Sequence, residues 1–155
     1  MPRQNRLART VDARRWGQQV FRLPAEDLYK RGYPPASGTQ VANAYGYLAH
    51  YTTLPRLSQL LQAGQIGGSA GCWLTPSELA ACMVPYDLGL NTPRDVCLLI
   101  DVRGVTDLWG PGTIPGSTAY RSIWRGGGIE FYVPQPLNTA VIRQVVPIEP
   151  CRDRW

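Results

Sequence analysis

The stretch YGYLAHYTTLPRLSQLLQAG, residues 45–64, contains a strand pattern followed at once by a helix pattern. Residues 45–51 are aromatic and bounded by turn-forming residues, which predicts a short strand. In the residues that follow, Thr52 or Thr53 can cap a helix, Pro55 suits its first turn, and Gly64 suits the position just after its end. Four leucines fall on one face at helical spacing, namely Leu54, Leu57, Leu60 and Leu61. The sequence therefore predicts a strand that leads directly into a helix.

Further short strand patterns recur along the chain, at residues 71–74, 96–102, 129–133 and 140–148. The residues 96–102 are nearly all apolar and β-branched, which is typical of a strand buried on both faces. Residues 75–78, TPSE, form a capping-box pattern that predicts a brief helix ending at Ala81. Residues 104–128 are rich in glycine and proline and predict a long loop. Short strands with small, early helices predict an α+β fold.

The length of 155 residues suits one compact domain preceded by a basic arm. Residues 1–31 carry seven Arg and one Lys against three acids, a net charge of +5, whereas residues 32–155 carry eight Arg against eight acids. We therefore assign residues 1–43 to a basic arm and linker, irregular over residues 23–38, and residues 44–150 to the folded domain. The arm either steers the protein toward RNA, DNA or an acidic protein, or is a solvated and partly disordered segment.

The composition excludes several classes of function. The four cysteines, Cys72, Cys82, Cys97 and Cys151, form no CxxC pair, and the chain has one histidine, so we expect no bound metal. Free thiols are typical of a reducing compartment. No apolar run approaches the roughly 20 residues that a bilayer-spanning helix needs, and residues 1–15 lack the apolar stretch of a secretory signal. We expect a cytoplasmic protein, in the producing cell or in a target cell, with no membrane partner.

Three short segments combine residue types that suit chemistry, and each also has a structural interpretation. LAHYT places the only histidine, His50, at a strand end before a capped helix, where a structural hydrogen bond is the commoner role. GCWLTP places Trp73 on a strand just before a helix start, as a core tryptophan would also be. GGGIEFYV embeds Glu130 in an apolar strand, so its charge must be exposed at the strand end, paired or functional.

Together, in this order and spacing, these segments resemble the ADP-ribosyltransferase superfamily in its His-Tyr-Glu branch. That branch includes the poly-ADP-ribose polymerases, the diphtheria-type toxins and, closest in pattern, the HYD1-type domains of bacterial polymorphic toxins. LAHYTT and the following LSQLLQAGQI resemble the family's histidine strand and the helix after it. GCWLTP is similar to the family's tyrosine segment, and IEFYV to its glutamate strand. The resemblance covers about residues 45–148 and implies a split β-sheet core that binds NAD as its substrate.

The resemblance implies a role for each polar motif residue. Glu130 would be catalytic, because a carboxylate beside the ribose stabilises the oxocarbenium-like state that forms as the nicotinamide leaves. His50 would hold the adenosine-side ribose through a ring nitrogen. Thr52 would add a hydroxyl contact to the same dinucleotide.

Aromatic residues would complete the NAD site and select the acceptor. The nicotinamide would stack on Trp73, which stands where the family has tyrosine and lacks the phenol hydroxyl. Tyr86 is implied as a second aromatic wall, and Tyr51 is an alternative for either role. In this family the loop before the glutamate contacts the acceptor, and its candidates here are Trp109, Tyr120, Arg121, Trp124 and Arg125. These tryptophans could equally anchor the loop to the core.

The function implied is that of a bacterial toxin or effector that moves ADP-ribose from NAD to a protein or nucleic acid and releases nicotinamide. A nucleic-acid acceptor could stack on Trp124 and Arg125. An antitoxin or immunity protein would be a further partner. Two alternatives stay open, an NAD glycohydrolase that uses water as acceptor, and a non-catalytic binding module in which Glu130 pairs with Arg121 or Arg125. RNA 2′-phosphotransferases share this fold, but their extra arginine pattern is not found here.

Overall fold

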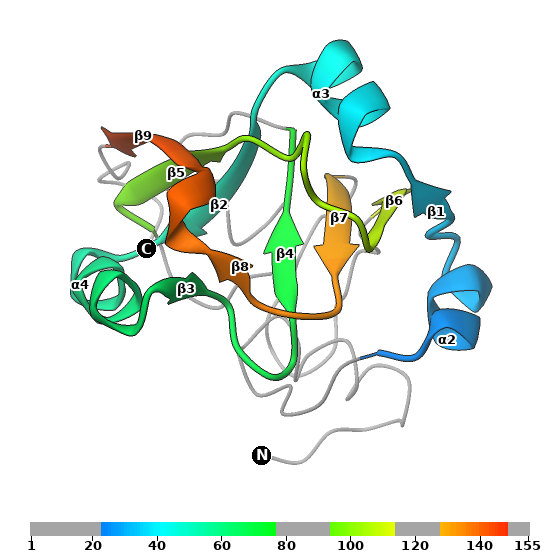
Figure 1. The fold of residues 1–155 in the computed structure, drawn as a ribbon, viewed down its shortest axis with the longest axis horizontal. Helices are drawn as coiled ribbons and strands as arrows, with labels where there is room; N and C mark the ends of the chain where they lie inside the picture. Colours follow the sequence, from blue (N-terminus) through cyan, green and yellow to red (C-terminus); the bar gives the residue numbers. More distant parts are fainter. Residues whose placement is uncertain (1–22, 77–93, 114–127, 149–155) are drawn as a thin grey trace, which may run out of the picture.

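The computed structural model of this chain describes residues 23–76, 94–113 and 128–148 (Figure 1). Its helices are α2 (Ala25–Lys30), α3 (Gly38–Tyr45), α4 (Leu54–Ala63) and the 3₁₀ helix η2 (Thr139–Val141). Its strands are β1 (Pro35–Ala36), β2 (Leu48–Thr52), β3 (Gln65–Ile66), β4 (Cys72–Leu74), β5 (Val96–Ile100), β6 (Leu108–Thr113), β7 (Ile129–Val133), β8 (Leu137–Asn138) and β9 (Ile142–Pro147). The expected α+β class is confirmed. Within the described ranges, no helix is both long and apolar enough to cross a bilayer.

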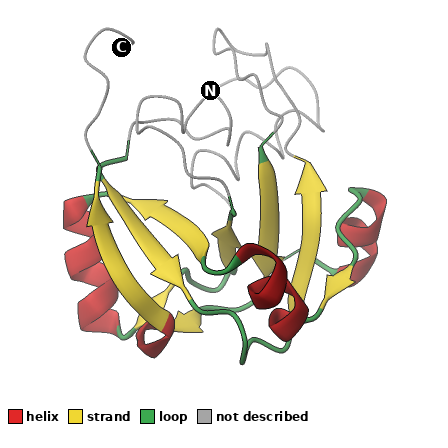
Figure 2. Cartoon of the chain, turned by 90° about the horizontal axis from the view of Figure 1, so that it is seen from above, coloured by secondary structure: helices red, strands yellow, loops and turns green. Residues whose placement is uncertain are grey.

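The strands form a four-stranded sheet in the order β1-β6-β7-β4, a three-stranded sheet in the order β2-β5-β9, and the pair β3-β8. All strand pairs within the described residues are antiparallel. The larger two sheets meet where Ala49 of β2 and Thr75, just after β4, exchange backbone hydrogen bonds of 2.6 and 2.9 Å. Figure 2 shows the strands in two groups on either side of the molecule. The two sheets are therefore joined along one edge by β2 and β4.

The β2–α4 unit has the local structure that its sequence predicts. The Thr53 side chain accepts a hydrogen bond from the Arg56 N–H at 3.4 Å, and Pro55 lies in the first turn. Gly64 ends the helix with a φ of 74°, a left-handed conformation that favours glycine. The predicted apolar face is partly wrong, because Leu57 and Leu60 pack against the core whereas Leu54 and Leu61 are exposed. α4 covers the core edge with half of its leucines.

The main core lies between the sheets and is lined by β2, β5, β4 and β7. Its fully buried members include Leu48, Leu74, Leu98, Ile100, Phe131 and Val133. β5 pairs with β2 on one side and β9 on the other. Its sequence is nearly all apolar because Val96, Leu98 and Ile100 face the main core, whereas Cys97 and Leu99 belong to a second apolar cluster on the other face. Strands were thus predicted correctly where burial on both faces leaves a continuous apolar run.

The expected linker over residues 23–38 is wrong. It contains α2 and β1, and Leu23, Leu28 and Tyr33 are buried in a cluster with Tyr132 of β7. Next along the chain, Ser37 caps α3 by accepting from the Gln40 N–H at 3.3 Å. α3 occupies residues that were expected to precede or start the strand, so β2 begins at Leu48 and not at residue 45.

The loop expected over residues 104–128 is also wrong at its start, because β6 spans Leu108–Thr113. This strand carries Gly110, Pro111 and Gly112, residue types that predicted a loop. Gly112 is required by packing, since a Cβ there would overlap the ring of Tyr33. The helix expected after residue 75, and the arm over residues 1–22, lie outside the described residues.

Candidate functional site

The functional candidate with the best-defined contacts is His50, on the inner face of β2. Its Nδ1 lies 2.9 Å from the backbone oxygen of Trp73. A carbonyl oxygen can only accept, so Nδ1 carries the proton and Nε2 is left as an acceptor when the ring is neutral. Burial lowers the pKa of His50; the Trp73 bond opposes this shift, and the positive charges of Arg94 and Arg56 add to it. His50 is therefore a neutral ring that offers one hydrogen-bond acceptor at pH 7.

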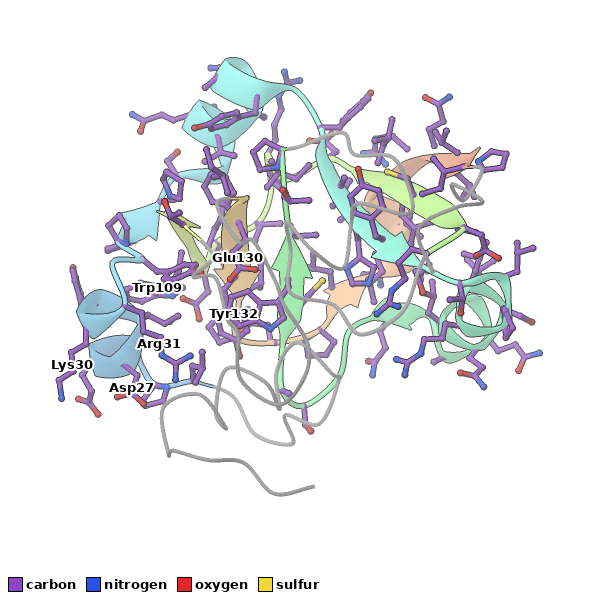
Figure 3. The ribbon with its side chains drawn as sticks, turned by 180° about the vertical axis from the view of Figure 1, so that it is seen from behind. Asp27, Lys30, Arg31, Trp109, Glu130 and Tyr132 are labelled. Atoms are coloured by element: carbon purple, nitrogen blue, oxygen red, sulfur yellow. The ribbon has the colours of Figure 1, made fainter. Side chains whose placement is uncertain are left out.

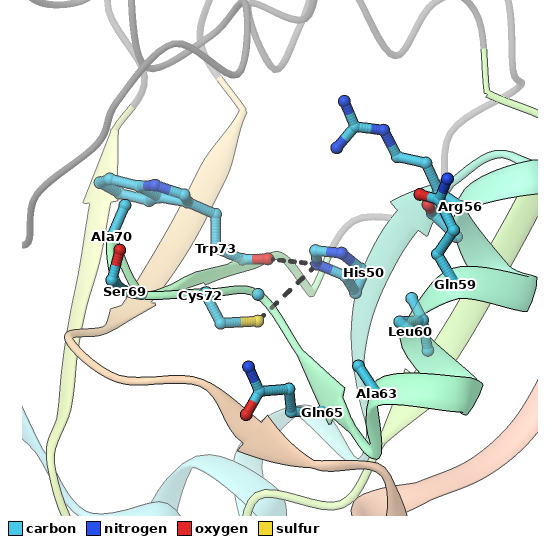
Figure 4. A pocket seen from close by; sticks show the side chains of 14 residues that line it. His50, Arg56, Gln59, Leu60, Ala63, Gln65, Ser69, Ala70, Cys72 and Trp73 are labelled. Atoms are coloured by element: carbon cyan, nitrogen blue, oxygen red, sulfur yellow. Dashed lines mark hydrogen bonds between the residues drawn. The ribbon is translucent and has the colours of Figure 1, made fainter.

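His50 lines a cavity of about 580 Å³, a volume within the range of ligand-binding pockets. The cavity lies between α4, the end of β2 and the segment leading into β4 (Figure 4). Its other lining residues are Thr52, Arg56, Gln59, Leu60, Ala63, Gln65, Gly67, Gly68, Ser69, Ala70, Gly71, Cys72 and Trp73. The lining combines a flat aromatic ring, a guanidinium, amides and exposed backbone, which suits a polar ligand with one ring system.

Glycines shape the wall of this cavity next to β4. Gly67 and Gly71 have φ values of 82° and 97°, and a Cβ on Gly71 would overlap the Val133 carbonyl and the Tyr132 ring. The Tyr132 hydroxyl donates to the Ala70 carbonyl and accepts from the Leu23 N–H at 3.2 Å. The segment is thus held against β7 by contacts that only glycine allows.

Trp73 connects the cavity with the neighbouring sheet. It lines the cavity, and its ring packs against Tyr132 with centroids 4.3 Å apart and planes tilted by 40°. The edge of the Tyr33 ring meets Trp73 with centroids 6.0 Å apart. Trp73 therefore has two roles. Its half-buried indole packs with the aromatic cluster, as expected of a core tryptophan, and it also contributes to the cavity lining.

Glu130 is 4% exposed and lies on β7. Register pairs Trp73 with Tyr132 and Leu74 with Phe131, so Glu130 and Tyr132 share one face of the sheet with Trp73. The Tyr33 hydroxyl donates a hydrogen bond to Glu130 Oε2. Figure 3 shows Glu130 beside Tyr132 on this face. A buried carboxylate needs such donors. At 4% exposure Glu130 is not an exposed strand-end acid, and the paired and functional possibilities raised for this charge both remain.

The structure brings some motif residues together and separates others. His50, Thr52 and Trp73 line one cavity, but Glu130 is not part of that lining. The contact from the cavity to the acid runs through the Trp73 ring to Tyr33, whose hydroxyl bonds Glu130. Tyr51 is buried on the opposite face of β2, among Ala49 and Cys97, and does not line this cavity.

Of the acceptor candidates, only Trp109 lies within the described residues. It belongs to β6 and not to a loop, its indole N–H donates to Asp107 Oδ1 at 2.8 Å, and Tyr29 packs edge-on against it. These contacts favour an anchoring role for Trp109. The other acceptor candidates, Tyr120, Arg121, Trp124 and Arg125, lie outside the described residues, as does Tyr86, the expected second aromatic wall of the NAD site.

Cys72 is the one thiol beside the imidazole among the described residues, with its Sγ 3.8 Å from His50 Nδ1. Burial raises the pKa of Cys72 to about 12, so it is a neutral thiol at pH 7 and a poor nucleophile. In the described part of the chain, no three His, Cys, Asp or Glu residues are grouped as a metal site would require.

Three residues at or near the site, Tyr33, Arg56 and Gln59, were not predicted from the sequence. Tyr33 lies in a proline-containing segment interpreted as linker, and its signal was only that of an isolated aromatic residue. Arg56 and Gln59 are three residues apart on the polar side of α4, a helix that was predicted from the spacing of its leucines. Helical spacing from the capped start near His50 could have identified this pair.

Comparisons of the chain with protein-family models, curated proteins and solved structures found no match.

Proposed function

We propose that this chain is an NAD-dependent ADP-ribosyltransferase of the His-Tyr-Glu type, which releases nicotinamide and passes ADP-ribose to a protein or nucleic acid. The observation that carries the proposal is the joining of His50 and Trp73 in one cavity, with Glu130 on the same sheet face as Trp73. The two sheets that meet at the Ala49–Thr75 bridge support a split-sheet core of that family. A bacterial toxin or effector is the biological class that the resemblance implies.

The cavity would bind the dinucleotide through its complementary groups. The free Nε2 of neutral His50 accepts a hydrogen bond from a ribose hydroxyl, and Thr52 lies two residues further along the same strand face. The Trp73 ring offers a flat surface for the nicotinamide. With the two ends of the dinucleotide held, the bond that breaks is positioned before reaction begins.

The chemical step would rest on the Glu130 carboxylate. As nicotinamide leaves, positive charge develops on its ribose, and a negative group nearby stabilises it. A nicotinamide stacked on Trp73 would carry this ribose toward the sheet face that holds Glu130. The Tyr33 hydroxyl fixes the orientation of the carboxylate through its hydrogen bond to Oε2.

The experiment is to incubate the full chain with NAD labelled in its adenylate part and with a bacterial lysate. Release of nicotinamide together with label in protein, RNA or DNA is the expected result. Nicotinamide release without any labelled macromolecule would identify a hydrolase instead. The absence of nicotinamide release, with or without lysate, overturns the enzymatic proposal.

One observation favours a second candidate, a non-catalytic nucleotide-binding module. Glu130 is buried, hydrogen-bonded to Tyr33 and absent from the cavity lining, as a purely structural acid would be. A module of this kind binds NAD or ADP-ribose and releases no nicotinamide. Its nucleotide affinity would depend on His50 and would be unchanged in Glu130→Gln.

A further inference from the structure

A positively charged group borders the cavity next to His50. Arg56 lies in the first turn of α4, is exposed, and lines the cavity with His50 and Gln59. Figure 4 shows its guanidinium reaching from α4 toward the space above His50. Within the described ranges, no carboxylate forms an ion pair with Arg56. Its charge is therefore available to a ligand in the cavity.

Arg94 is held near the same end of β2. It precedes Asp95, whose N–H donates to the Thr52 carbonyl at 3.2 Å and whose Oδ1 accepts from the Leu54 N–H at 3.1 Å. Burial lowers the pKa of Arg94, the positive charge of Arg56 lowers it further, and Asp95 opposes the shift. The two guanidiniums are thus close enough to repel each other beside an uncharged imidazole.

We propose that Arg56, supported by Arg94, forms a binding site for the pyrophosphate group of a nucleotide next to His50. Phosphate oxygens match the planar donor fork of a guanidinium, and a bound anion would relieve the repulsion between two such groups. His50, Arg56 and Trp73 line one cavity as a hydroxyl-binding group, a phosphate-binding group and a ring-binding surface. A nucleotide joins ribose, phosphate and ring in one molecule. The inference rests on the proposed function for the identity of the nucleotide, whereas the anion site can be tested by itself.

The test measures binding by calorimetry to the full chain, with inorganic pyrophosphate, ADP-ribose and adenosine as probes. Arg56→Gln is expected to weaken pyrophosphate and ADP-ribose binding by roughly tenfold or more, since a charge-assisted bond to phosphate is lost. Adenosine affinity should stay within about twofold, and the salt dependence of ADP-ribose binding should decrease. The matched control is Arg103→Gln, an exposed arginine outside the cavity lining that makes the same change in net charge.

The outcomes separate this inference from the proposed function. Wild-type protein that binds pyrophosphate but cleaves no NAD would keep the anion site and overturn the transferase. Cleavage of NAD with equal pyrophosphate affinity in the wild-type protein and Arg56→Gln would keep the transferase and overturn the anion site. If the wild-type protein binds neither pyrophosphate nor ADP-ribose, the anion site is overturned. The same holds if Arg103→Gln loses as much affinity for these two probes as Arg56→Gln does.

Discussion

The hydroxyl of Tyr33 donates a hydrogen bond to Oε2 of Glu130 across 97 residues of sequence, inside the protein. Tyr33 is 3% exposed, and its ring also contacts Trp73, a residue that lines the cavity. The segment expected to be a linker therefore orients the acid expected to be catalytic. If the proposed function holds, Tyr33 is a positioning residue whose effect should be visible in both stability and activity.

Tyr33→Phe removes one hydroxyl and keeps the ring. The free energy of unfolding should fall by about 1–3 kcal/mol, because a buried carboxylate loses a donor. Nicotinamide release should fall about tenfold, through kcat and with the KM for NAD little changed, because the carboxylate proposed to act in the chemical step is no longer held in one orientation. Tyr29→Phe is the matched control, since Tyr29 is 60% exposed. A loss of stability with an unchanged kcat would reduce Tyr33 to a structural role.

Glu130→Gln should abolish nicotinamide release and leave the fold intact. The amide has nearly the volume of the acid, and its oxygen can still accept from the Tyr33 hydroxyl. Loss of the charge that stabilises the developing cation is worth about 2.7–4 kcal/mol in activation free energy, or about 100- to 1,000-fold in rate. Nicotinamide release and thermal unfolding of the variant check both parts. A variant that keeps a tenth of the wild-type turnover contradicts the catalytic role.

The elements predicted from sequence were those whose signals are local or continuous. β7 matches its predicted range of residues 129–133, and α4 ends at the predicted Gly64, because apolar runs and caps are encoded in neighbouring residues. β6 was missed, because Gly110, Pro111 and Gly112 suggest a loop unless the packing of Tyr33 against Gly112 is known.

In the candidate site, too, local sequence motifs were informative, whereas contacts between distant segments were not predictable. His50 and Trp73 lie in one cavity, as the order of their motifs implied. The pairing of Glu130 with Tyr33 was not predictable, since it joins two segments with no shared pattern in the sequence. Tyr51 lies on the face of β2 opposite His50, as the alternation of side chains along a strand already implies.

The protonation of His50 gives a prediction about pH. Its pKa is lowered from the ordinary value of 6.5, mainly by burial, so between the lowered value and 6.5 the unfolded chain binds more protons than the folded one. The free energy of unfolding should therefore fall as pH decreases through 6.5, and this part of the fall should be absent in His50→Gln. Chemical denaturation of both proteins between pH 5 and 8 measures the difference. Parallel curves for the two proteins would show that His50 titrates at its ordinary pKa.

The affinity for ADP-ribose should also depend on the protonation state of His50. Because neutral His50 offers Nε2 as an acceptor, ADP-ribose affinity should stay constant as pH falls from 7.5 to about 6.5, and should decrease only after the folded protein binds its proton. His50→Ala should weaken ADP-ribose binding by roughly tenfold, as the loss of one hydrogen bond predicts. Calorimetry at several pH values tests both statements. Equal affinity in His50→Ala would remove this residue from the nucleotide site.

Gly112→Ala should destabilise the protein and reduce activity together. A Cβ at Gly112 meets the Tyr33 ring, which is buried and cannot swing into solvent, so β6 or Tyr33 must shift. Such overpacking costs about 1–3 kcal/mol, and the shift should also loosen the Tyr33–Glu130 hydrogen bond. Gly104→Ala is the control, because its Cβ would meet no atom within 4 Å. If the activity loss in Gly112→Ala acts through Tyr33, combining it with Tyr33→Phe should lower nicotinamide release little further. Independent, multiplying losses would show that Gly112 supports the site by another route.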